Sequence, residues 1–222
     1  MKAGFFVAGT DTGVGKTFFS AALLRRFGAL GLRAAGMKPI AAGCERGRNE
    51  DVEALLAAST PGLDRGLVCP YLFEPPIAPH IAAREAGVKI DLAAIEQAFV
   101  TLTKSLDVVV VEGVGGFRVP LGERMNAAAI PKRLGLPVIL VVGLRLGCLN
   151  HALLTQEAIE ADGLALAGWV ANRIDPAMAR AEENVEALEQ RLHAPLLADV
   201  PFGAPSEFPV ALERLWPGRG SP

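Results

Sequence analysis

The segment GTDTGVGKT, Gly9–Thr17, constrains the fold of this chain more than any other feature. It lies between a short apolar run and a helix-like stretch, so a buried strand leads into a glycine-rich turn just before a helix begins. Glycines can adopt positive φ and aim successive N–H groups at an anion, and the helix N-terminus adds about half a positive charge. Lys16 then reaches the β- and γ-phosphates of a nucleotide, and the Thr17 hydroxyl is placed to bind Mg²⁺. The segment predicts a phosphate-binding loop for ATP or GTP.

This loop departs from the usual phosphate-binding pattern at one position. The usual pattern has a glycine where this chain has Thr10, whereas the available glycine is Gly9, so the loop is one residue longer. A glycine-rich turn between a strand and a helix can also serve only for close packing. The Gly-Lys-Thr triplet at the start of a helix favours phosphate binding over that alternative.

The length and charge of the chain favour one α/β domain without a polyanionic partner. A chain of 222 residues can bury about 70% of its unfolded surface in a single core. We expect one domain over residues 1–222, with a poorly ordered or variable tail at 210–222. The formal net charge of −2 provides no basic field of the kind that attracts nucleic acids or anionic membranes, so we expect neither as a partner.

Cysteine usage and hydropathy indicate a reducing, cytoplasmic environment. Cys44, Cys69 and Cys148 are odd in number and far apart, which fits neither a disulfide framework nor paired metal ligands. We expect no targeting signal. The longest apolar stretch, Leu134–Leu146, is interrupted by glycine, proline and arginine and is shorter than the ~20 residues needed to cross a bilayer.

Apolar runs alternate with amphipathic segments along the whole chain. The runs expected to form strands are Phe5–Ala8, Ala34–Ile40, Val108–Val111, Val138–Val142, Ala165–Ala171 and Leu196–Val200. The segments expected to form helices are Thr17–Leu30, Val52–Ala58, Leu92–Leu106, Ala127–Leu134, Asn150–Ala161 and Ala177–Leu192. This alternation predicts a doubly wound, mostly parallel sheet with helices on both faces, of the P-loop NTPase type.

Polar residues follow several of these runs, at the sheet edge where ligands bind in such folds. Lys38 follows an apolar strand and suits an anionic intermediate or a transferring phosphoryl group, although a lysine can also extend to solvent. Glu112 ends the run of valines, and burying its carboxylate is costly without a cation. Mg²⁺ beside a nucleotide is the expected partner, and capping of a neighbouring helix is the alternative.

Two further residues remain ambiguous from the sequence. Asp51 has the position of an ordinary acidic residue at the start of a helix, where the dipole favours it. His80 follows a proline-rich stretch and is either an ordinary loop residue or part of a substrate pocket.

Five segments together resemble one enzyme family. They are GTDTGVGKT (9–17), GMKPIAAG (36–43), VEGVGG (111–116), PVILVVG (137–143) and LGCLNHALLT (146–155). They closely resemble the ATP-dependent dethiobiotin synthetases, in the same order over about residues 3–201, and the lengthened phosphate loop is that family's form. The combination is far more specific than any single motif.

The resemblance implies a ring-closing ligase of biotin biosynthesis. The family forms the ureido ring of dethiobiotin from 7,8-diaminopelargonic acid, CO₂ and ATP. One amine captures CO₂ as a carbamate, whose oxygen takes the γ-phosphoryl group. The second amine then attacks the mixed carbamic-phosphoric anhydride and expels phosphate. The chemistry requires positioning and charge neutralisation, which lysines, Mg²⁺ and inward N–H groups supply.

The resemblance also assigns roles to individual residues. Lys16 and Lys38 are the catalytic lysines, the first on the phosphates and the second bridging the carbamate and the γ-phosphoryl group. The expected Mg²⁺ ligands are Thr17, Asp51 and Glu112. The expected nucleotide-binding residues are Gly13, Val14, Gly15, Lys16, Thr17, Phe18, Asp51, Glu112, Gly113, Val114, Gly115, Asn172, Arg173, Pro201, Phe202 and Gly203. The expected substrate-binding residues are Thr12, Lys38, Gly147, Cys148 and Asn150.

The family pattern implies a homodimer in which the helix start near Gly147–Asn150 binds the distant carboxylate of a substrate held by the other subunit. Three positions depart from the pattern. Ala42 stands where a hydroxyl residue is usual, Gly13 where some relatives carry an acidic residue, and Arg173 where an acidic residue can follow the adenine-side asparagine.

The alternative function is a dimeric ATP-dependent switch of the partition or septum-positioning type. Such proteins place a second lysine early in the phosphate loop, where this chain has Thr10, Asp11 and Thr12. They also need a membrane helix or a DNA-binding surface, and the proline-interrupted segment 205–222 does not suit either role.

Overall fold

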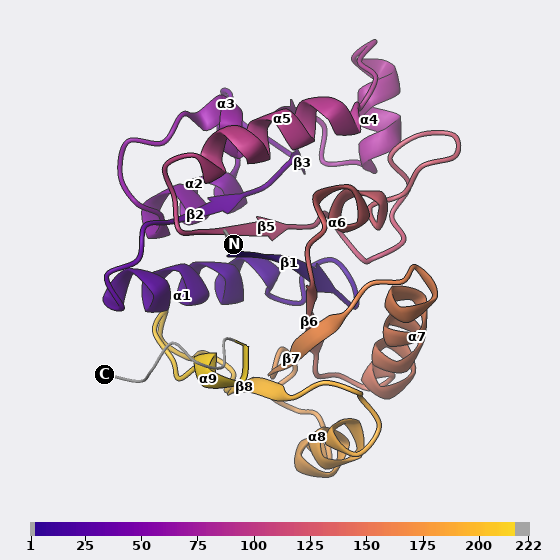
Figure 1. Ribbon diagram of the computed structural model, residues 1–222. Coiled ribbons are helices and arrows are strands. Elements are labelled where there is room, and N and C mark those ends of the chain that lie inside the picture. Colours follow the sequence, from indigo (N-terminus) through magenta and orange to yellow (C-terminus); the bar gives the residue numbers. More distant parts are fainter. Residues whose placement is uncertain (1–2, 216–222) are drawn as a thin grey trace.

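The computed structural model describes residues 3–215 and contains a six-stranded parallel sheet in the order β2-β5-β1-β6-β7-β8 (Figure 1). Its strands are β1 (Ala3–Gly9), β2 (Ala34–Met37), β5 (Val108–Glu112), β6 (Val138–Gly143), β7 (Leu166–Asn172) and β8 (Leu196–Val200). Every neighbouring pair in this sheet is parallel. The predicted doubly wound α/β fold is confirmed.

Helices cover both faces of the sheet (Figure 1). The helices in chain order are α1 (Lys16–Ala29), α2 (Glu50–Ala58), α3 (Arg65–Val68), α4 (Pro79–Glu85), α5 (Leu92–Thr103), α6 (Ala129–Leu134), α7 (Cys148–Ala161), α8 (Ala181–Glu189) and α9 (Leu212–Leu215). Side chains of α1, α2 and α9 form the core on one face, and side chains of α5, α6, α7 and α8 form the core on the other.

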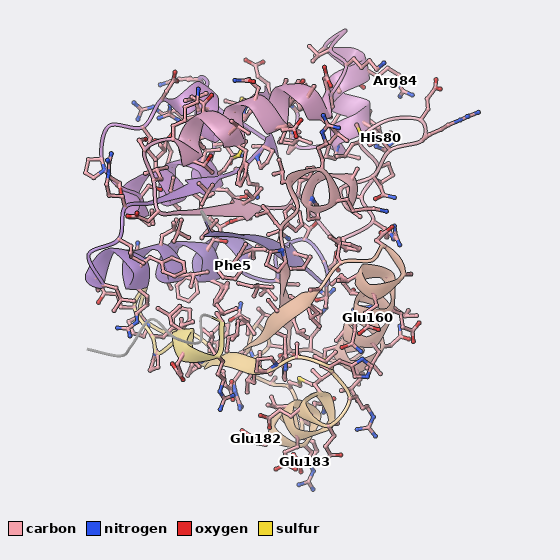
Figure 2. The ribbon with its side chains drawn as sticks, in the orientation of Figure 1. Phe5, His80, Arg84, Glu160, Glu182 and Glu183 are labelled. Carbon is pink, nitrogen blue, oxygen red and sulfur yellow. The ribbon has the colours of Figure 1, made fainter. Side chains whose placement is uncertain are left out.

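Strand β1 divides its side chains between these two cores. Phe5 and Val7 belong to the core beneath α1, whereas Phe6 and Ala8 belong to the opposite core. Successive residues of a strand point to opposite faces, so a strand covered on both sides is apolar throughout. Figure 2 shows Phe5 inside the molecule, while Glu160, Glu182 and Glu183 project from the outer helices.

The predicted strand Ala34–Ile40 is wrong, because the chain divides it between two sheets. Strand β2 ends at Met37, and β3 (Ile40–Ala42) pairs in parallel with β4 (Tyr71–Phe73) in a separate two-stranded sheet. Lys38 and Pro39 cause the break: the Lys38 N–H donates to the Val68 carbonyl, and proline has no N–H to continue the ladder. The break turns the Lys38 side chain toward the carboxyl edge of the main sheet.

Some element boundaries also differ from the sequence prediction. Helix α8 spans nine residues instead of the predicted Ala177–Leu192, and α7 begins at Cys148, two residues earlier than predicted. Helices α3, α4 and α9 and strand β4 were not predicted, because each is only three to seven residues long and lacks a clear period.

The beginning of the expected tail is ordered against the sheet. Val210 and Leu212 are buried, and the Ala211 N–H donates to the Leu197 carbonyl of β8. Of the expected tail 210–222, residues 216–222 lie outside the described residues. Helices long and apolar enough to span a membrane are absent from residues 3–215.

Candidate active site

The phosphate loop connects β1 to α1 and is fixed by a contact with β7. Gly15 precedes α1 with φ 89°, and a Cβ on it would lie 2.1 Å from the Asn172 Nδ2 atom. The same Nδ2 atom donates to the Val14 carbonyl at 2.8 Å. A residue with a side chain therefore fits neither the backbone conformation nor the space at Gly15. The loop predicted from Gly9–Thr17 has the strand–loop–helix geometry that anion binding requires.

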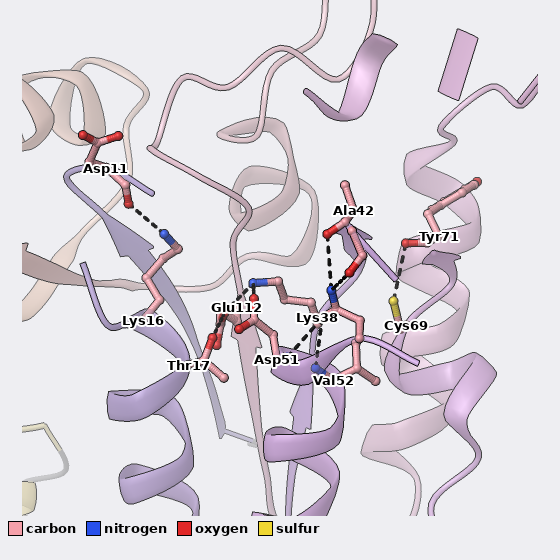
Figure 3. A network of polar contacts seen from close by, with 12 residues as sticks. Asp11, Lys16, Thr17, Lys38, Ala42, Asp51, Val52, Cys69, Tyr71 and Glu112 are labelled. Carbon is pink, nitrogen blue, oxygen red and sulfur yellow. Dashed lines mark hydrogen bonds and ion pairs between the residues drawn. The ribbon is translucent and has the colours of Figure 1, made fainter. Parts of the chain in front are cut away.

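Lys16 is the first residue of α1, and its side chain turns back over the loop. Its Nζ donates to the Asp11 carbonyl at 2.8 Å, as Figure 3 shows. Burial, with a further contribution from the positive charge of Lys38, lowers the pKa of Lys16 to about 8. The hydrogen-bond acceptor of the Lys16 ammonium is therefore a neutral carbonyl, and an incoming anion would be a stronger partner.

Lys38 lies at the end of β2 between two carboxylates (Figure 3). Its Nζ is 2.8 Å from Asp51 Oδ2 and 2.5 Å from Glu112 Oε1, and the side chain is buried. Burial alone would lower the pKa of Lys38, but the charges and hydrogen bonds of Glu112 and Asp51 outweigh it and raise the pKa. The two carboxylates thus favour the charged form of Lys38, and because the side chain is buried, the alternative of an extension to solvent is wrong.

Glu112 ends β5 and is buried beside the start of α1. Its Oε1 accepts a hydrogen bond from the Thr17 hydroxyl at 2.7 Å. Its Oε2 is also buried and has no hydrogen-bond partner among the described residues. A buried carboxylate oxygen without a partner is unfavourable unless a cation binds it. Glu112 therefore contacts a side chain of α1 but caps no backbone N–H of that helix, and its second oxygen is left for a cation.

Asp51 lies in the first turn of α2 and contacts the Lys38 ammonium, as Glu112 does. Burial alone would raise the pKa of Asp51, but the charge and hydrogen bond of Lys38, the nearby Thr17 hydroxyl and the charge of Lys16 together lower it. Asp51 is consequently ionised and belongs to the site, which its position in the sequence does not show by itself.

The oxygens of Thr17, Asp51 and Glu112 suit Mg²⁺ that arrives with a nucleotide better than a metal ion whose ligands are all protein side chains. Clusters of three or more His, Cys, Asp or Glu that could hold a metal are absent from the described part of the chain. Two carboxylates and one hydroxyl converge instead, from Asp51, Glu112 and Thr17. Mg²⁺ is commonly bound by one or two carboxylates together with substrate phosphates and water. The donor set therefore fits Mg²⁺ delivered with a nucleotide.

A cavity of about 680 Å³ joins these groups. The predicted site residues that line it are Thr12, Gly13, Gly15, Lys16, Thr17, Lys38, Asp51, Glu112, Val114 and Gly115. Residues not predicted for the site complete the wall: Ala41, Ala42, Asn49, Pro76, Ile77, Ala78, Pro79 and Val119. Asn49 carries a sequence signal, since an asparagine just before two acidic residues is typical of a helix cap. The segment 76–79 has no such sequence signal, because it is far along the chain from the phosphate loop and reaches the cavity only through the fold.

Other predicted nucleotide-binding residues lie outside this cavity lining. Asn172 contacts the other side of the loop, and Pro201, Phe202 and Gly203 follow β8 and are exposed. Phe18 stacks on Phe208, and Gly113 lies against the Phe6 ring, which a Cβ would approach to 2.9 Å.

Arg173, also predicted to bind the nucleotide, is engaged with carboxylates. Its guanidinium donates to both oxygens of Asp199 at 2.8 Å and to Glu182 at 2.7 Å. These hydrogen bonds, to Asp199 first and then to Glu182, raise the pKa of Arg173. The structure therefore gives Arg173 a bridging position between β7, β8 and α8.

The remaining predicted substrate-binding residues lie at the start of α7. Gly147 precedes this helix with φ 96°, Cys148 is buried and Asn150 is exposed. They do not line the cavity of the same chain. His80 lies in α4 (Figure 2), outside the cavity lining, and its buried Nδ1 has no hydrogen-bond partner among the described residues.

Comparison with known proteins decides the family. A family model described as an AAA domain matches residues 3–209. An ATP-dependent dethiobiotin synthetase of Nitrosospira multiformis is 57% identical over 202 residues, covering 91% of this chain and 89% of that protein. The counterpart of Aromatoleum aromaticum is 60% identical over 206 residues, covering 90% of this chain and 91% of that protein. This chain belongs to the dethiobiotin synthetase family.

Solved structures of other P-loop proteins share the fold of this dethiobiotin synthetase family member. The septum site-determining protein MinD of Pyrococcus horikoshii, complexed with Mg-ADP, gives a TM-score of 0.56 at 17% identity, covering 90% of this chain and 82% of that one. A ParA family ATPase of Chlorobium tepidum gives 0.54 at 13% identity, with coverages of 90% and 84%. Likeness at this level of identity concerns the fold alone, so it carries no switch function over to this chain.

Proposed function

We propose that this protein is a carbon–nitrogen cyclo-ligase that closes the ureido ring of dethiobiotin. Its substrates are 7,8-diaminopelargonic acid, CO₂ and ATP with Mg²⁺, and its other products are ADP and phosphate. The observation that carries the proposal is the meeting of two buried lysines, Lys16 and Lys38, with Thr17, Asp51 and Glu112 around one cavity. The relatives named ATP-dependent dethiobiotin synthetase support it.

The reaction makes two demands that these residues can meet. A carbamate formed from one amine and CO₂ is an anion, and so is the γ-phosphoryl group that its oxygen attacks. Bringing two anions together needs fixed positive charge in a site of low dielectric. Lys16 binds the phosphates, and Lys38 bridges the carbamate and the γ-phosphoryl group. The second amine then attacks the carbonyl carbon of the anhydride, and phosphate leaves with the former carbamate oxygen.

Mg²⁺ would be held by Thr17, Asp51 and Glu112, and when bound it supplies charge that neutralises the phosphates. Lys38 contacts Asp51 and Glu112, two of these proposed metal ligands. With a divalent cation bound there, the two carboxylates would hold Lys38 less strongly, and its ammonium would be free to contact the substrate anions.

The adenine-side contacts and the dimer are part of the same proposal. Asn172 at the end of β7 and the residues after β8, Pro201–Gly203, would surround the base, with Arg173 fixing the two strands. The start of α7 would bind the distant carboxylate of a substrate in the cavity of a second subunit. Leu146 just before α7 is 95% exposed and Leu154 in α7 is 55% exposed, and both would be covered in that homodimer. Action in the cytoplasm remains an expectation of the sequence.

Product formation tests this proposal. The protein is incubated with Mg-ATP, bicarbonate and 7,8-diaminopelargonic acid, and the cyclic urea is sought by mass spectrometry. We expect dethiobiotin and ADP in equal amounts, and almost no product from the Lys38→Ala variant. ATP hydrolysis without the cyclic urea would contradict the proposal and favour the switch alternative.

A further inference from the structure

Asn49 is the residue just before α2, and it is buried in the wall of the cavity. The proposed reaction gives it no role. Its Oδ1 accepts hydrogen bonds from the Asp51 N–H at 3.1 Å and the Val52 N–H at 3.3 Å. These bonds cap α2, a function that serine, threonine or aspartate would perform equally well.

The other half of the amide makes contacts that no other capping residue can make. Asn49 Nδ2 donates to the Ala42 carbonyl at 3.3 Å and to the Gly43 carbonyl at 3.1 Å, at the end of β3. The side chain therefore uses two donors and two acceptor directions, which saturates a primary amide. A cap alone does not require the two N–H donors, and here they join the start of α2 to a second segment of the chain.

The carbonyls that accept them lie at the end of β3, in and beside the cavity wall. Ala42 lines the cavity, and the Gly43 N–H donates to the Pro75 carbonyl at 3.2 Å, next to the wall formed by residues 76–79. The direct chain connection between β3 and α2, residues 44–48, is mostly exposed and crosses positive-φ positions at Arg46 and Gly47. The amide is a shorter link than this loop and is buried.

We infer that Asn49 is a positioning residue, which fastens the Asp51 end of α2 to the cavity wall at Ala42–Gly43 and so fixes the proposed metal ligand Asp51 relative to that wall. Asn49 acts through Asp51, which contacts Lys38, and through the wall. The inference rests on the proposed function. Small misplacements of reacting groups are costly, so loosening the link lowers turnover more than it lowers nucleotide binding.

Two substitutions separate the link from the cap. Asn49→Ser keeps a good cap without charge but is too short to reach the Ala42 and Gly43 carbonyls. Asn49→Asp keeps the shape and the cap but presents an oxygen to those carbonyls. We expect both variants to lose kcat by about tenfold or more, to need several times more Mg²⁺ for tight ATP binding in calorimetry, and to keep their ATP affinity in EDTA within about threefold.

Asn126 offers a matched control outside the cavity lining. Its Oδ1 accepts a hydrogen bond from the Ala128 N–H at 3.0 Å, so Asn126→Ser and Asn126→Asp change the same atoms at another capped turn. These controls should keep kcat and the Mg²⁺ dependence, and thermal melts of all the variants report stability separately.

Three results would overturn the inference. One is wild-type kcat and Mg²⁺ dependence in either Asn49 variant. Another is a loss that follows the fall in melting temperature and is matched by the Asn126 controls, since it would show a purely structural role. The third is an equal loss of ATP affinity with and without Mg²⁺. If the wild-type protein forms no dethiobiotin, the proposed function fails. The Mg²⁺ dependence of ATP binding in the Asn49 variants still decides whether Asn49 fixes Asp51 relative to the cavity wall at Ala42–Gly43.

Discussion

The two lysines of the cavity are buried to a similar degree but are held in opposite ways. Lys16 donates to one neutral carbonyl and its pKa falls to about 8, whereas Lys38 lies between two carboxylates and its pKa is raised. A cation beside a neutral acceptor gains strongly from an incoming polyanion. A cation that is already paired with carboxylates is stabilised by an incoming anion only when another cation shares the carboxylates' negative charge. This difference supports the proposal that Lys16 serves mainly to bind the nucleotide and Lys38 serves the chemical step.

Removing Lys38 should have the largest effect. In Lys38→Ala, we expect kcat to fall by about 10²–10³-fold, the range for loss of one fixed charge-stabilising group, while ATP still binds. The variant also leaves Asp51 and Glu112 facing each other without their cation. Mg²⁺ should therefore raise the melting temperature of Lys38→Ala more than that of the wild type. Near wild-type turnover would contradict the role of Lys38 in the chemical step. Equal stabilisation of both proteins by Mg²⁺ would contradict its charge pairing with Asp51 and Glu112.

Removing Lys16 should mainly weaken binding. In Lys16→Ala, we expect the ATP dissociation constant to rise by roughly ten- to a hundredfold, because a hydrogen bond to a charged group contributes about 1.5–3 kcal/mol. Calorimetry with Mg-ATP measures this change. Unchanged ATP affinity would remove the phosphate-binding role of Lys16 and leave the contrast with Lys38 without support.

The phosphate loop itself can be tested at Gly15. Gly15→Ala combines positive φ with a clash against Asn172, so we expect a loss of roughly 1–3 kcal/mol, seen as weaker ATP binding and a lower melting temperature. Gly28→Ala is the matched control within α1, where a Cβ meets no atom within 4 Å. It should be neutral or stabilise the protein by about 0.5–1 kcal/mol. Equal behaviour of the two variants would contradict the loop geometry.

The pH dependence of ATP binding should give the smallest and most specific effect. With its pKa at about 8, Lys16 is largely neutral at pH 9 in the free protein, and bound phosphates favour its protonated form. ATP binding should therefore take up a proton above pH 8, and the affinity should fall as the pH rises from 8 to 9. Calorimetry in buffers of different ionisation enthalpy measures the uptake, which should vanish in Lys16→Ala. Proton release or no transfer would contradict the lowered pKa of Lys16.

The sequence predicts those parts of the site that depend on local order along the chain. The phosphate loop follows from glycine spacing between a strand and a helix, and Lys38 and Glu112 follow from being polar at the ends of apolar runs. The sheet and most of its helices follow from hydrophobic periodicity. Asp51 was assigned only through the family resemblance, since an acidic residue at a helix start has the same local pattern whether or not it meets a distant lysine.

Other features depend on contacts that no local pattern records. The split of Ala34–Ile40 into β2 and β3 arises where Lys38 pairs with Val68 instead of a sheet neighbour. The engagement of Arg173 with Asp199 and Glu182 joins β7, β8 and α8. Residues 76–79 lie at the cavity because the preceding strand β4 pairs with β3. Both strands have three residues, which is too short to predict from the sequence.

The most direct test of the account follows one oxygen atom through the reaction. If the carbamate oxygen attacks the γ-phosphoryl group and the second amine then breaks the anhydride, one oxygen of CO₂ leaves in the phosphate. With ¹⁸O-labelled bicarbonate and Mg-ATP, we predict one ¹⁸O atom in the released phosphate for each dethiobiotin formed, and a rate of labelled phosphate release that collapses in Lys38→Ala. Phosphate released at the wild-type rate without ¹⁸O would contradict the account, because phosphoryl transfer would then not pass through the carbamate that Lys38 is proposed to hold.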